Sequence, residues 1–313
     1  MAGLIALTGA SGFIGQSLTR TFIESGWPVR ALLRRPHAGV AGLGAELVDG
    51  ALDNAGALER LVDGAQVVVH CAGAIKARNR AEFMAVNAAG TAAVAKAAAG
   101  VASPPAMTLL SSLAAREPGL SDYAASKRAG ETALAEAGSA LRKAIVRPPA
   151  VYGPGDRSTL PLIHQLSRGW LIAPGRPDAR FSLLYVEDLA ASLLHILNQA
   201  DWSGTPLELD DGTPGGYGWK DLAAAAERAT GRRIRHFTVP RQALWLPALA
   251  NEAVSGAMGR APLVTRGKLR ELYHGDWVAR RVEAPEIAGW RADVTFVDGF
   301  RRAVQWYKRE GWL

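Results

Sequence analysis

The stretch Leu4–Gly15, LIALTGASGFIG, joins a short apolar run to a glycine-rich turn. The apolar run predicts a buried strand, and the following Phe13–Ser25 predicts a helix. Gly9 permits a tight turn, Gly12 lets a pyrophosphate approach the backbone, and Gly15 allows the helix to pack closely on the strand. The unpaired N–H groups at a helix N-terminus favour an anion. The stretch therefore predicts a dinucleotide-binding turn, and the alternative is a tight turn without a ligand.

The rest of the first half repeats this alternation of strand and helix. Further apolar runs predict strands at Val29–Leu33, Ala45–Val48, Gln66–His70, Met107–Leu110 and Lys143–Val146. Ala- and Leu-rich segments predict helices at Ala55–Val62, Arg80–Ala99 and Tyr123–Ala137. Strands that alternate with crossover helices form parallel sheets with right-handed connections. The expected fold class is α/β, a Rossmann doubly wound parallel sheet.

The composition changes after about Pro148, where aromatic residues become frequent and Pro and Gly interrupt the pattern. Helices are predicted at Trp219–Thr230, Arg241–Met258 and Val297–Glu310. We expect a dinucleotide-binding Rossmann domain over 1–150, to which segments near 181–200 return. Residues 151–313 are expected to form mainly a smaller, mostly helical substrate-binding region.

Charge and cysteine content narrow the function classes. The formal net charge is +7, but no run of five or more basic residues occurs and the basic residues are scattered, which argues against nucleic acid. A solvated surface is the plainest interpretation, with an anionic ligand or membrane contact as alternatives. The single Cys71 excludes an internal disulfide, and no Cys/His cluster has metal-ligand spacing. The N-terminus resembles neither a signal peptide nor a membrane span, so we expect a cytoplasmic protein without a metal.

The end of the second strand bears on the choice of cofactor. An NAD site favours an acidic side chain there for the ribose 2′-hydroxyl. Here the strand Val29–Leu33 runs into Arg34 and Arg35. A guanidinium suits the 2′-phosphate through charge-assisted hydrogen bonds. NADP(H) is therefore the preferred cofactor, with NAD(H) still open and a surface arginine pair as the alternative reading.

A candidate catalytic group follows the fifth strand. Tyr123 and Lys127 in YAASK are one helical turn apart and share a face. A nearby ammonium lowers the pKa of a tyrosine from about 10, so the phenol can exchange protons with an alcohol or ketone. Ser111 and Ser112 end the strand MTLLSS at the carboxyl edge of the sheet, where α/β proteins bind ligands. The Ser112 hydroxyl is expected to polarise a substrate oxygen there.

These landmarks, taken together, resemble the extended short-chain dehydrogenase/reductase family, which includes NAD-dependent epimerases and dehydratases. The resemblance rests on LTGASGFIG, HCAG at 70–73, Asn87 in VNAAGT, Ser112, YAASK, RPPAVYGPGD at 147–156 and FSLLYVEDLA at 181–190. It implies that Tyr123 protonates a carbonyl oxygen, that Lys127 also holds the nicotinamide ribose, and that Asn87 supports the geometry. It further implies cofactor contacts from Gly9, Ser11, Gly12, Phe13, Ile14, Gly15, Arg34, Arg35, Leu52, Cys71, Ala72, Gly73, Tyr123, Lys127, Pro148 and Val151.

Two departures weaken a nucleotide-sugar reading. Ser112 and Tyr123 are only 11 positions apart, and the loop between them lacks the aromatic–glycine pair usual in those enzymes. Ala51 stands where the family commonly has an acidic residue, although Asp49 or Asp53 can substitute.

The C-terminal part, from Gly289 to Leu313, resembles dihydroflavonol-reductase-like and 3β-hydroxysteroid-dehydrogenase-like proteins, as does the segment 240–263. An apolar substrate fits that resemblance. The helix within 240–263 is too short and interrupted to span a bilayer, so core packing or contact with a membrane surface remain its two interpretations.

The leading functional hypothesis is an NADP(H)-dependent oxidoreductase that interconverts a hydroxyl and a carbonyl on a small or apolar substrate. A nucleotide-sugar epimerase or dehydratase is the first alternative. A non-catalytic NADP-binding protein, like the respiratory complex I subunit that resembles this family, is the second. The intact Ser112, Tyr123 and Lys127 argue against the latter. The expected partner is a small-molecule substrate, and family members often pair as homodimers.

Overall fold

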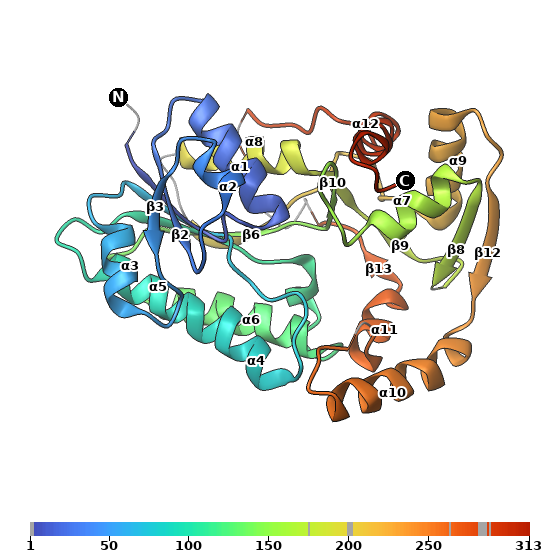
Figure 1. Ribbon diagram of the computed structural model, residues 1–313, viewed down its shortest axis with the longest axis horizontal. Coiled ribbons are helices and arrows are strands. Elements are labelled where there is room, and N and C mark those ends of the chain that lie inside the picture. Colours follow the sequence, from blue (N-terminus) through green and yellow to red (C-terminus); the bar gives the residue numbers. More distant parts are fainter. Residues whose placement is uncertain (1–2, 175, 199–202, 263, 281–286, 288) are drawn as a thin grey trace. The chain divides into compact units, whose positions relative to one another are not determined.

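A computed structural model describes residues 3–174, 176–198, 203–262, 264–280, 287 and 289–313 (Figure 1). Leu263, at the end of the segment singled out above, lies outside these residues. The chain divides into two compact units. The first comprises 1–147, 190–207 and 281–290, and the second comprises 148–189, 208–280 and 291–313.

A seven-stranded sheet forms the centre of the first unit. Its strand order is β11-β6-β5-β4-β1-β2-β3, and β1 to β6 pair in parallel. The strands are β1 (Ile5–Thr8), β2 (Val29–Leu33), β3 (Glu46–Asp49), β4 (Val67–His70), β5 (Ala106–Leu110), β6 (Lys143–Arg147) and β11 (Ser203–Glu208). The predicted Rossmann doubly wound fold is confirmed.

Helices cover both faces of this sheet. Figure 1 shows α3, α4, α5 and α6 on one face and α1 on the other. The helices are α1 (Phe13–Glu24), α2 (Ala38–Ala41), α3 (Ala55–Val62), α4 (Arg80–Met84), α5 (Gly90–Ala99), α6 (Asp122–Ala135) and the 3₁₀ turn η2 (Leu113–Arg116). Because both faces are covered, β1, β4 and β5 are buried at every position, as their continuous apolar runs predict.

The stretch Arg80–Ala99, predicted as one helix, is interrupted. A π-helical turn, η1 (Ala85–Ala89), separates α4 from α5. Its centre is Asn87, whose side chain is hydrogen-bonded outside its own helix. A π turn changes the direction of side chains and is frequent at functional sites, whereas an Ala-rich sequence gives no sign of it.

The second unit contains more strand than the predicted, mostly helical region. Three two-stranded parallel sheets pair β7 (Ala150–Tyr152) with β10 (Leu183–Tyr185), β8 (Trp170–Pro174) with β12 (Arg235–Val239), and β9 (Arg180–Phe181) with β13 (Asp276–Trp277). Its helices are α7 (Leu160–Ser167), α9 (Trp219–Thr230), α10 (Arg241–Ala257), α11 (Arg266–Leu272) and α12 (Phe296–Arg309). The helix α8 (Val186–Leu197) begins in the second unit and continues into the first.

Two of the sequence landmarks organise the core of the second unit. Asp188 accepts hydrogen bonds from the backbone N–H groups of Asp293 and Val294, at 3.0 and 3.1 Å. Tyr307 donates toward the carbonyl oxygens of Gly153 and Asp156, at 3.0 and 2.7 Å. The YVEDLA and VYGPGD motifs therefore anchor the C-terminal segment. In the described part of the chain, no helix has the length and apolar character needed to cross a membrane.

Candidate active site

The glycine loop lies at the point where the strand order reverses, between β4 and β2 on either side of β1. Gly9 has a φ of +78°, and a Cβ there would lie 2.6 Å from the backbone nitrogen of Ala72. A Cβ on Gly15 would lie 2.0 Å from the Gly9 carbonyl oxygen. At Gly12, the N-cap of α1, a Cβ would meet only the Gly9 carbonyl oxygen, at 3.4 Å, and no side chain caps the helix. Gly9 and Gly15 therefore leave no room for a side chain, whereas the space beside Gly12, where a pyrophosphate would approach, is open.

The other predicted loop contacts differ in exposure. Ser11 is exposed, and Phe13 and Ile14 are half-buried. Leu52 packs closely against Gly90 of α5. A Cβ added to Gly90 would lie only 2.7 Å from Leu52 Cδ1.

A buried polar chain supports the strand ends beside this loop. His70 Nδ1 is 2.7 Å from Thr8 Oγ1, which accepts a hydrogen bond from the backbone N–H of Ala72. His70 Nε2 is 3.1 Å from Thr91 Oγ1, and Thr91 in turn donates to the Asn87 carbonyl oxygen. Burial, and then the nearby Lys127, lowers the pKa of His70 to about 3. This histidine stays neutral and acts as a structural link.

Asn87 fixes the segment after β4. Its side chain accepts from the backbone N–H of Ala74 at 2.7 Å and donates to the carbonyl oxygen of Ala74 at 2.9 Å. It also donates to Ser126 Oγ at 2.8 Å, which ties this segment to α6. Asn87 therefore positions the HCAG segment against the helix that carries YAASK.

Lys127 reaches into the same place from α6. Its buried Nζ donates to the carbonyl oxygen of Leu110 at 2.7 Å. A Cβ on Gly73 would lie 3.6 Å from this Nζ and 3.2 Å from Asn87 Oδ1, so the three predicted residues meet. Burial lowers the pKa of Lys127 from 10.5 to about 8, against opposing contributions from Cys71 and Glu131. Burial also raises the pKa of Cys71 to about 12, so this thiol stays protonated.

Ser112 and Tyr123 lie at the starts of η2 and α6, the two elements that follow β5. Tyr123 is half-buried in the first turn of α6, and its ring centroid lies 6.1 Å from that of Phe83. Ser112 is the N-cap of η2, and its Oγ accepts a hydrogen bond from the backbone N–H of Ala114 at 3.2 Å. A serine hydroxyl also carries one hydrogen with which it can donate.

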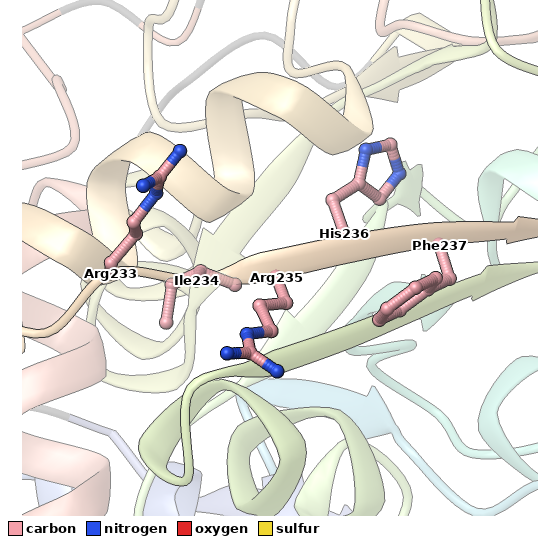
Figure 2. Close-up of a pocket in the computed structure, with 5 residues that line it drawn as sticks. All are labelled: Arg233, Ile234, Arg235, His236 and Phe237. Carbon is pink, nitrogen blue, oxygen red and sulfur yellow. The ribbon is translucent and has the colours of Figure 1, made fainter.

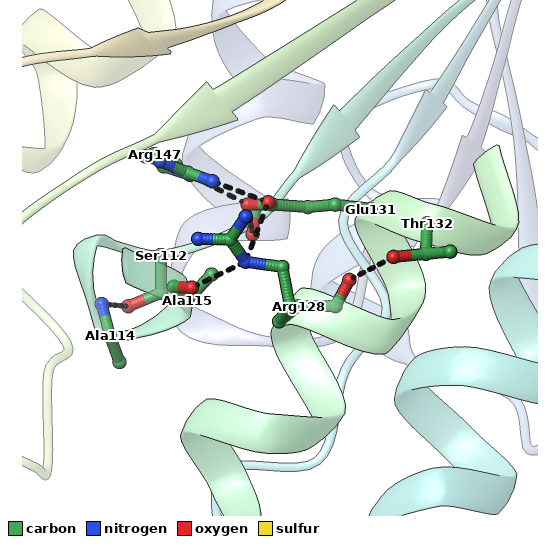
Figure 3. Close-up of polar contacts among 8 residues, drawn as sticks. Ser112, Ala114, Ala115, Arg128, Glu131, Thr132 and Arg147 are labelled. Atoms are coloured by element: carbon green, nitrogen blue, oxygen red, sulfur yellow. Dashed lines mark hydrogen bonds and ion pairs between the residues drawn. The ribbon is translucent and has the colours of Figure 1, made fainter. Parts of the chain in front are cut away.

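Sequence reasoning missed Glu131, one turn beyond Lys127 on the same face of α6. Its buried carboxylate binds the Arg147 guanidinium at 2.8 and 2.6 Å and accepts from Ser111 Oγ at 2.5 Å. Figure 3 shows Arg128 and Arg147 turned toward this carboxylate, with Arg128 Nε at 3.8 Å. The i, i+4, i+8 spacing of Tyr123, Lys127 and Glu131 places all three on one face of the helix, but it does not show that Glu131 is buried.

The remaining predicted cofactor residues lie in two places. Arg34 and Arg35 are exposed directly after β2, and no ion pair to either is seen within the described ranges. Pro148 and Val151 belong to the second unit, where Val151 pairs with Leu184. Their contact with the cofactor stays a prediction.

A pocket of about 640 Å³ lies in the second unit and involves none of the predicted site residues. Arg233, Ile234, Arg235, His236 and Phe237 line it, at the start of β12 (Figure 2). Among the residues that the structure describes, no group of three His, Cys, Asp or Glu side chains is placed to hold a metal ion.

Comparisons with known proteins identify the family. Residues 5–208 match the NAD dependent epimerase/dehydratase family. The chain is 40% identical over 318 residues to the ceramide reductase of Caulobacter vibrioides, covering 99% of this chain and 96% of that protein. It is 31% identical over 175 residues to the 4-hydroxy-2-methyl-3-oxo-4-farnesyl-3,4-dihydroquinoline-1-oxide ketoreductase of Stigmatella aurantiaca, covering 50% of this chain and 52% of that protein.

Solved structures share the fold at lower identity. The UDP-glucose 4-epimerase of Thermotoga maritima superimposes with a TM-score of 0.73 at 17% identity, over 98% of this chain and 99% of that one. At this identity the likeness concerns the fold. Family membership rests instead on the family match over 204 residues and on the full-length similarity to a reductase. The chain belongs to the NAD dependent epimerase/dehydratase family and is an NAD(P)-dependent oxidoreductase.

Proposed function

We propose that the protein is an NADP(H)-dependent ketoreductase whose substrate carries a long hydrocarbon chain. The observation that carries this proposal is the 40% identity to a ceramide reductase over 99% of the chain, combined with an intact Ser112, Tyr123 and Lys127. The shorter match names a ketoreductase of a farnesylated compound. Ceramide and a farnesyl group both carry long apolar chains, so both names favour an apolar ketone over a nucleotide sugar.

The residues present fit a nicotinamide dinucleotide. The uncapped N-terminus of α1 and the open position at Gly12 suit the pyrophosphate. Gly73 leaves the space beside Lys127 Nζ and Asn87 free of a side chain. Arg34 lies at the end of β2, where the ribose 2′-phosphate of NADP(H) is held in this fold.

Each of the chain's own polar groups would then have a separate role in reduction of the carbonyl. A bound nicotinamide supplies a hydride to the carbonyl carbon of the substrate. Tyr123 donates its phenolic proton to the carbonyl oxygen, which becomes a hydroxyl. The Lys127 ammonium stabilises the phenolate that remains, and the Ser112 hydroxyl donates a hydrogen bond to the same substrate oxygen. Asn87 and Ser126 hold α6 against the HCAG segment and so keep these groups in place.

Replacing Arg34 by aspartate is expected to raise the Kd of NADPH at least about tenfold and that of NADH by less than about threefold. The new carboxylate repels a 2′-phosphate, which only NADPH carries. Calorimetric titration of the purified protein with each cofactor measures both values. Arg20→Asp, the same charge change on exposed α1, is the control and should leave both affinities near those of the wild type. Equal weakening of NADPH and NADH by Arg34→Asp would exclude the phosphate assignment.

The pH dependence of ketone reduction should follow Lys127. The ammonium form is the active one, and the pKa of this group is lowered to about 8. We therefore expect kcat/KM to fall above about pH 8, by up to about tenfold per pH unit. No limb is expected near pH 6.5 from His70, since the pKa of its ring is lowered to about 3. A pH–rate profile under saturating NADPH measures this, and a constant rate up to pH 10 contradicts the role of the ammonium.

Retention of the cofactor separates this proposal from an epimerase. A reductase exchanges NADPH for NADP⁺ at each turnover, whereas an epimerase retains its nicotinamide through the reaction. The protein purified by gel filtration without added cofactor should therefore contain less than about 0.1 equivalent of nicotinamide, as measured after acid denaturation. A stoichiometric amount of tightly held NAD would instead favour the epimerase.

A further inference from the structure

The helix α10 turns its apolar side outward. With 3.6 residues per turn, one face carries Ala243, Leu246, Leu249, Ala250, Ala253, Val254 and Ala257, all of which are exposed. We call these seven residues the α10 face. Leu246 is 71% exposed and Val254 is 58% exposed. No charged residue lies on this face, so the helix lacks the polar outer surface expected of a helix that packs on a core.

Two polar residues on the other side of α10, Asn251 and Glu252, are already bound, while the uncharged Gln242 lies on the exposed side. Asn251 Oδ1 accepts from the backbone N–H of Val264 at 3.1 Å. Glu252 accepts from the backbone N–H and the Nε of Arg266, each at 2.7 Å. Ala248, on the same side, is buried. The orientation of α10 is therefore fixed by contacts inside the second unit, and the exposure of the α10 face is a property of the fold. Of the two interpretations left open for this segment, core packing does not describe the seven exposed residues of the α10 face.

The positive charge of the chain is concentrated around this helix. Residues 232–270 contain eight Arg and Lys side chains and one carboxylate, that of Glu252. Outside this segment the chain has 28 basic and 28 acidic residues. With Glu271, which ends this run and pairs with Lys268 at 2.9 Å, the segment 232–272 of β12, α10, α11 and their connections carries +6 of the net charge of +7, although no contiguous basic run marks it in the sequence.

The strand that precedes α10, β12, also carries exposed apolar and basic side chains together. Arg235 and Phe237 point to one side of β12 and His236 to the other (Figure 2). On β8, Trp170 and Ile172 are exposed in register with Arg235 and Phe237, and the rings of Trp170 and Phe237 are stacked at 6.0 Å. Exposed aromatic rings beside cationic side chains are typical of proteins at the boundary between water and lipid.

From these observations we propose that the α10 face docks on an anionic lipid bilayer. An apolar, uncharged helix face inserts among the acyl chains near the surface, while surrounding cations bind acidic headgroups. The large excess of cations disfavours a second copy of the same surface as the occupant, because two such segments repel each other. The choice of a bilayer rests on the proposed function in one respect, that a long-chain ketone resides in a membrane. The exposed α10 face and the positive charge do not depend on the proposed function.

Vesicle co-sedimentation of the full chain tests this docking, with neither NADPH nor ketone present. The wild type is expected to bind vesicles of phosphatidylglycerol and phosphatidylcholine at least about tenfold more strongly than vesicles of phosphatidylcholine alone, with added salt weakening the binding. Leu246→Glu should reduce binding to the acidic vesicles about tenfold or more. Leu47→Glu is the matched control, since Leu47 on β3 is 41% exposed and the charge change is the same. Both variants should melt like the wild type.

Three results would overturn the docking. The wild type fails to bind acidic vesicles, Leu246→Glu binds as well as the wild type, or Leu47→Glu loses binding equally. Light scattering without vesicles measures the oligomeric state and so tests the other possible occupant, a second copy of the chain. If the wild type is a dimer that Leu246→Glu converts to a monomer, with vesicle binding unchanged, the face belongs to a dimer interface. Because no ketone is present, failure of the ketoreductase proposal leaves these outcomes unaffected.

Discussion

Replacing Tyr123 by phenylalanine is expected to lower kcat for ketone reduction about a thousandfold, because the phenolic hydroxyl is the proposed proton donor. Phenylalanine preserves the ring and its contact with Phe83, at a centroid distance of 6.1 Å, and removes one oxygen atom. The Kd of NADPH should stay within about twofold of the wild type, since the glycine loop and Arg34 are unchanged. Steady-state kinetics and a cofactor titration measure the two effects.

The control for this substitution removes the same atom elsewhere. Tyr273 donates to the carbonyl oxygen of Val239 at 2.6 Å in the second unit. Tyr273→Phe should keep the kcat within about twofold, with at most a modest loss of stability. Retention of the wild-type kcat by Tyr123→Phe would remove the acid role from this residue.

A second large effect is expected on stability. Glu131→Gln leaves the Arg147 guanidinium in a buried place without the carboxylate that binds it at 2.6 Å. Removing one partner of a buried ion pair typically costs about 3–5 kcal/mol of unfolding free energy, because the remaining charge is uncompensated. The hydroxyl of Ser111 also loses a charged acceptor. Denaturant unfolding followed by circular dichroism measures the change.

An exposed ion pair provides the comparison. Arg176 and Asp178 are joined at 2.6 Å, with side chains 61% and 66% exposed. Asp178→Asn should leave the denaturation midpoint unchanged, since water and salt screen such a pair. A Glu131→Gln variant as stable as the wild type would show that the buried cluster does not stabilise the first unit.

The fold of the first unit could be predicted from the sequence because its central strands β1, β4 and β5 are buried on both faces. β1 and β4 are apolar almost throughout, and β1 is followed by glycines whose spacing has a steric reason, as the close approach of Gly15 to Gly9 demonstrates. Periodicity could not show the π turn at Asn87, because an Ala-rich segment has the same pattern with or without it. Strands as short as β9 and β13 leave too few residues for a pattern.

The candidate site was accessible in part. Gly73, Asn87 and Lys127, each singled out in the sequence, lie together, because η1 and α6 bring Asn87 and Lys127 to the segment that follows β4. Glu131 was missed because a glutamate on an Ala-rich helix resembles a solvated residue until its burial is known. The exposure of Leu246 could not be decided from the sequence for the converse reason: an apolar pattern gives the side of a helix and not what covers it. The preference for NADP(H), the roles of the site residues and the cytoplasmic location stay predictions.

The most direct test of the central claim is oxidation of NADPH by the purified protein with a long-chain ketone, such as a 3-keto sphingoid base in mixed micelles, with product identification by mass spectrometry. The account predicts consumption of NADPH, one hydroxyl formed per NADPH oxidised, release of NADP⁺, and loss of this turnover in Tyr123→Phe. No turnover with long-chain ketones, together with epimerisation of a nucleotide sugar by a tightly retained NAD, would contradict it.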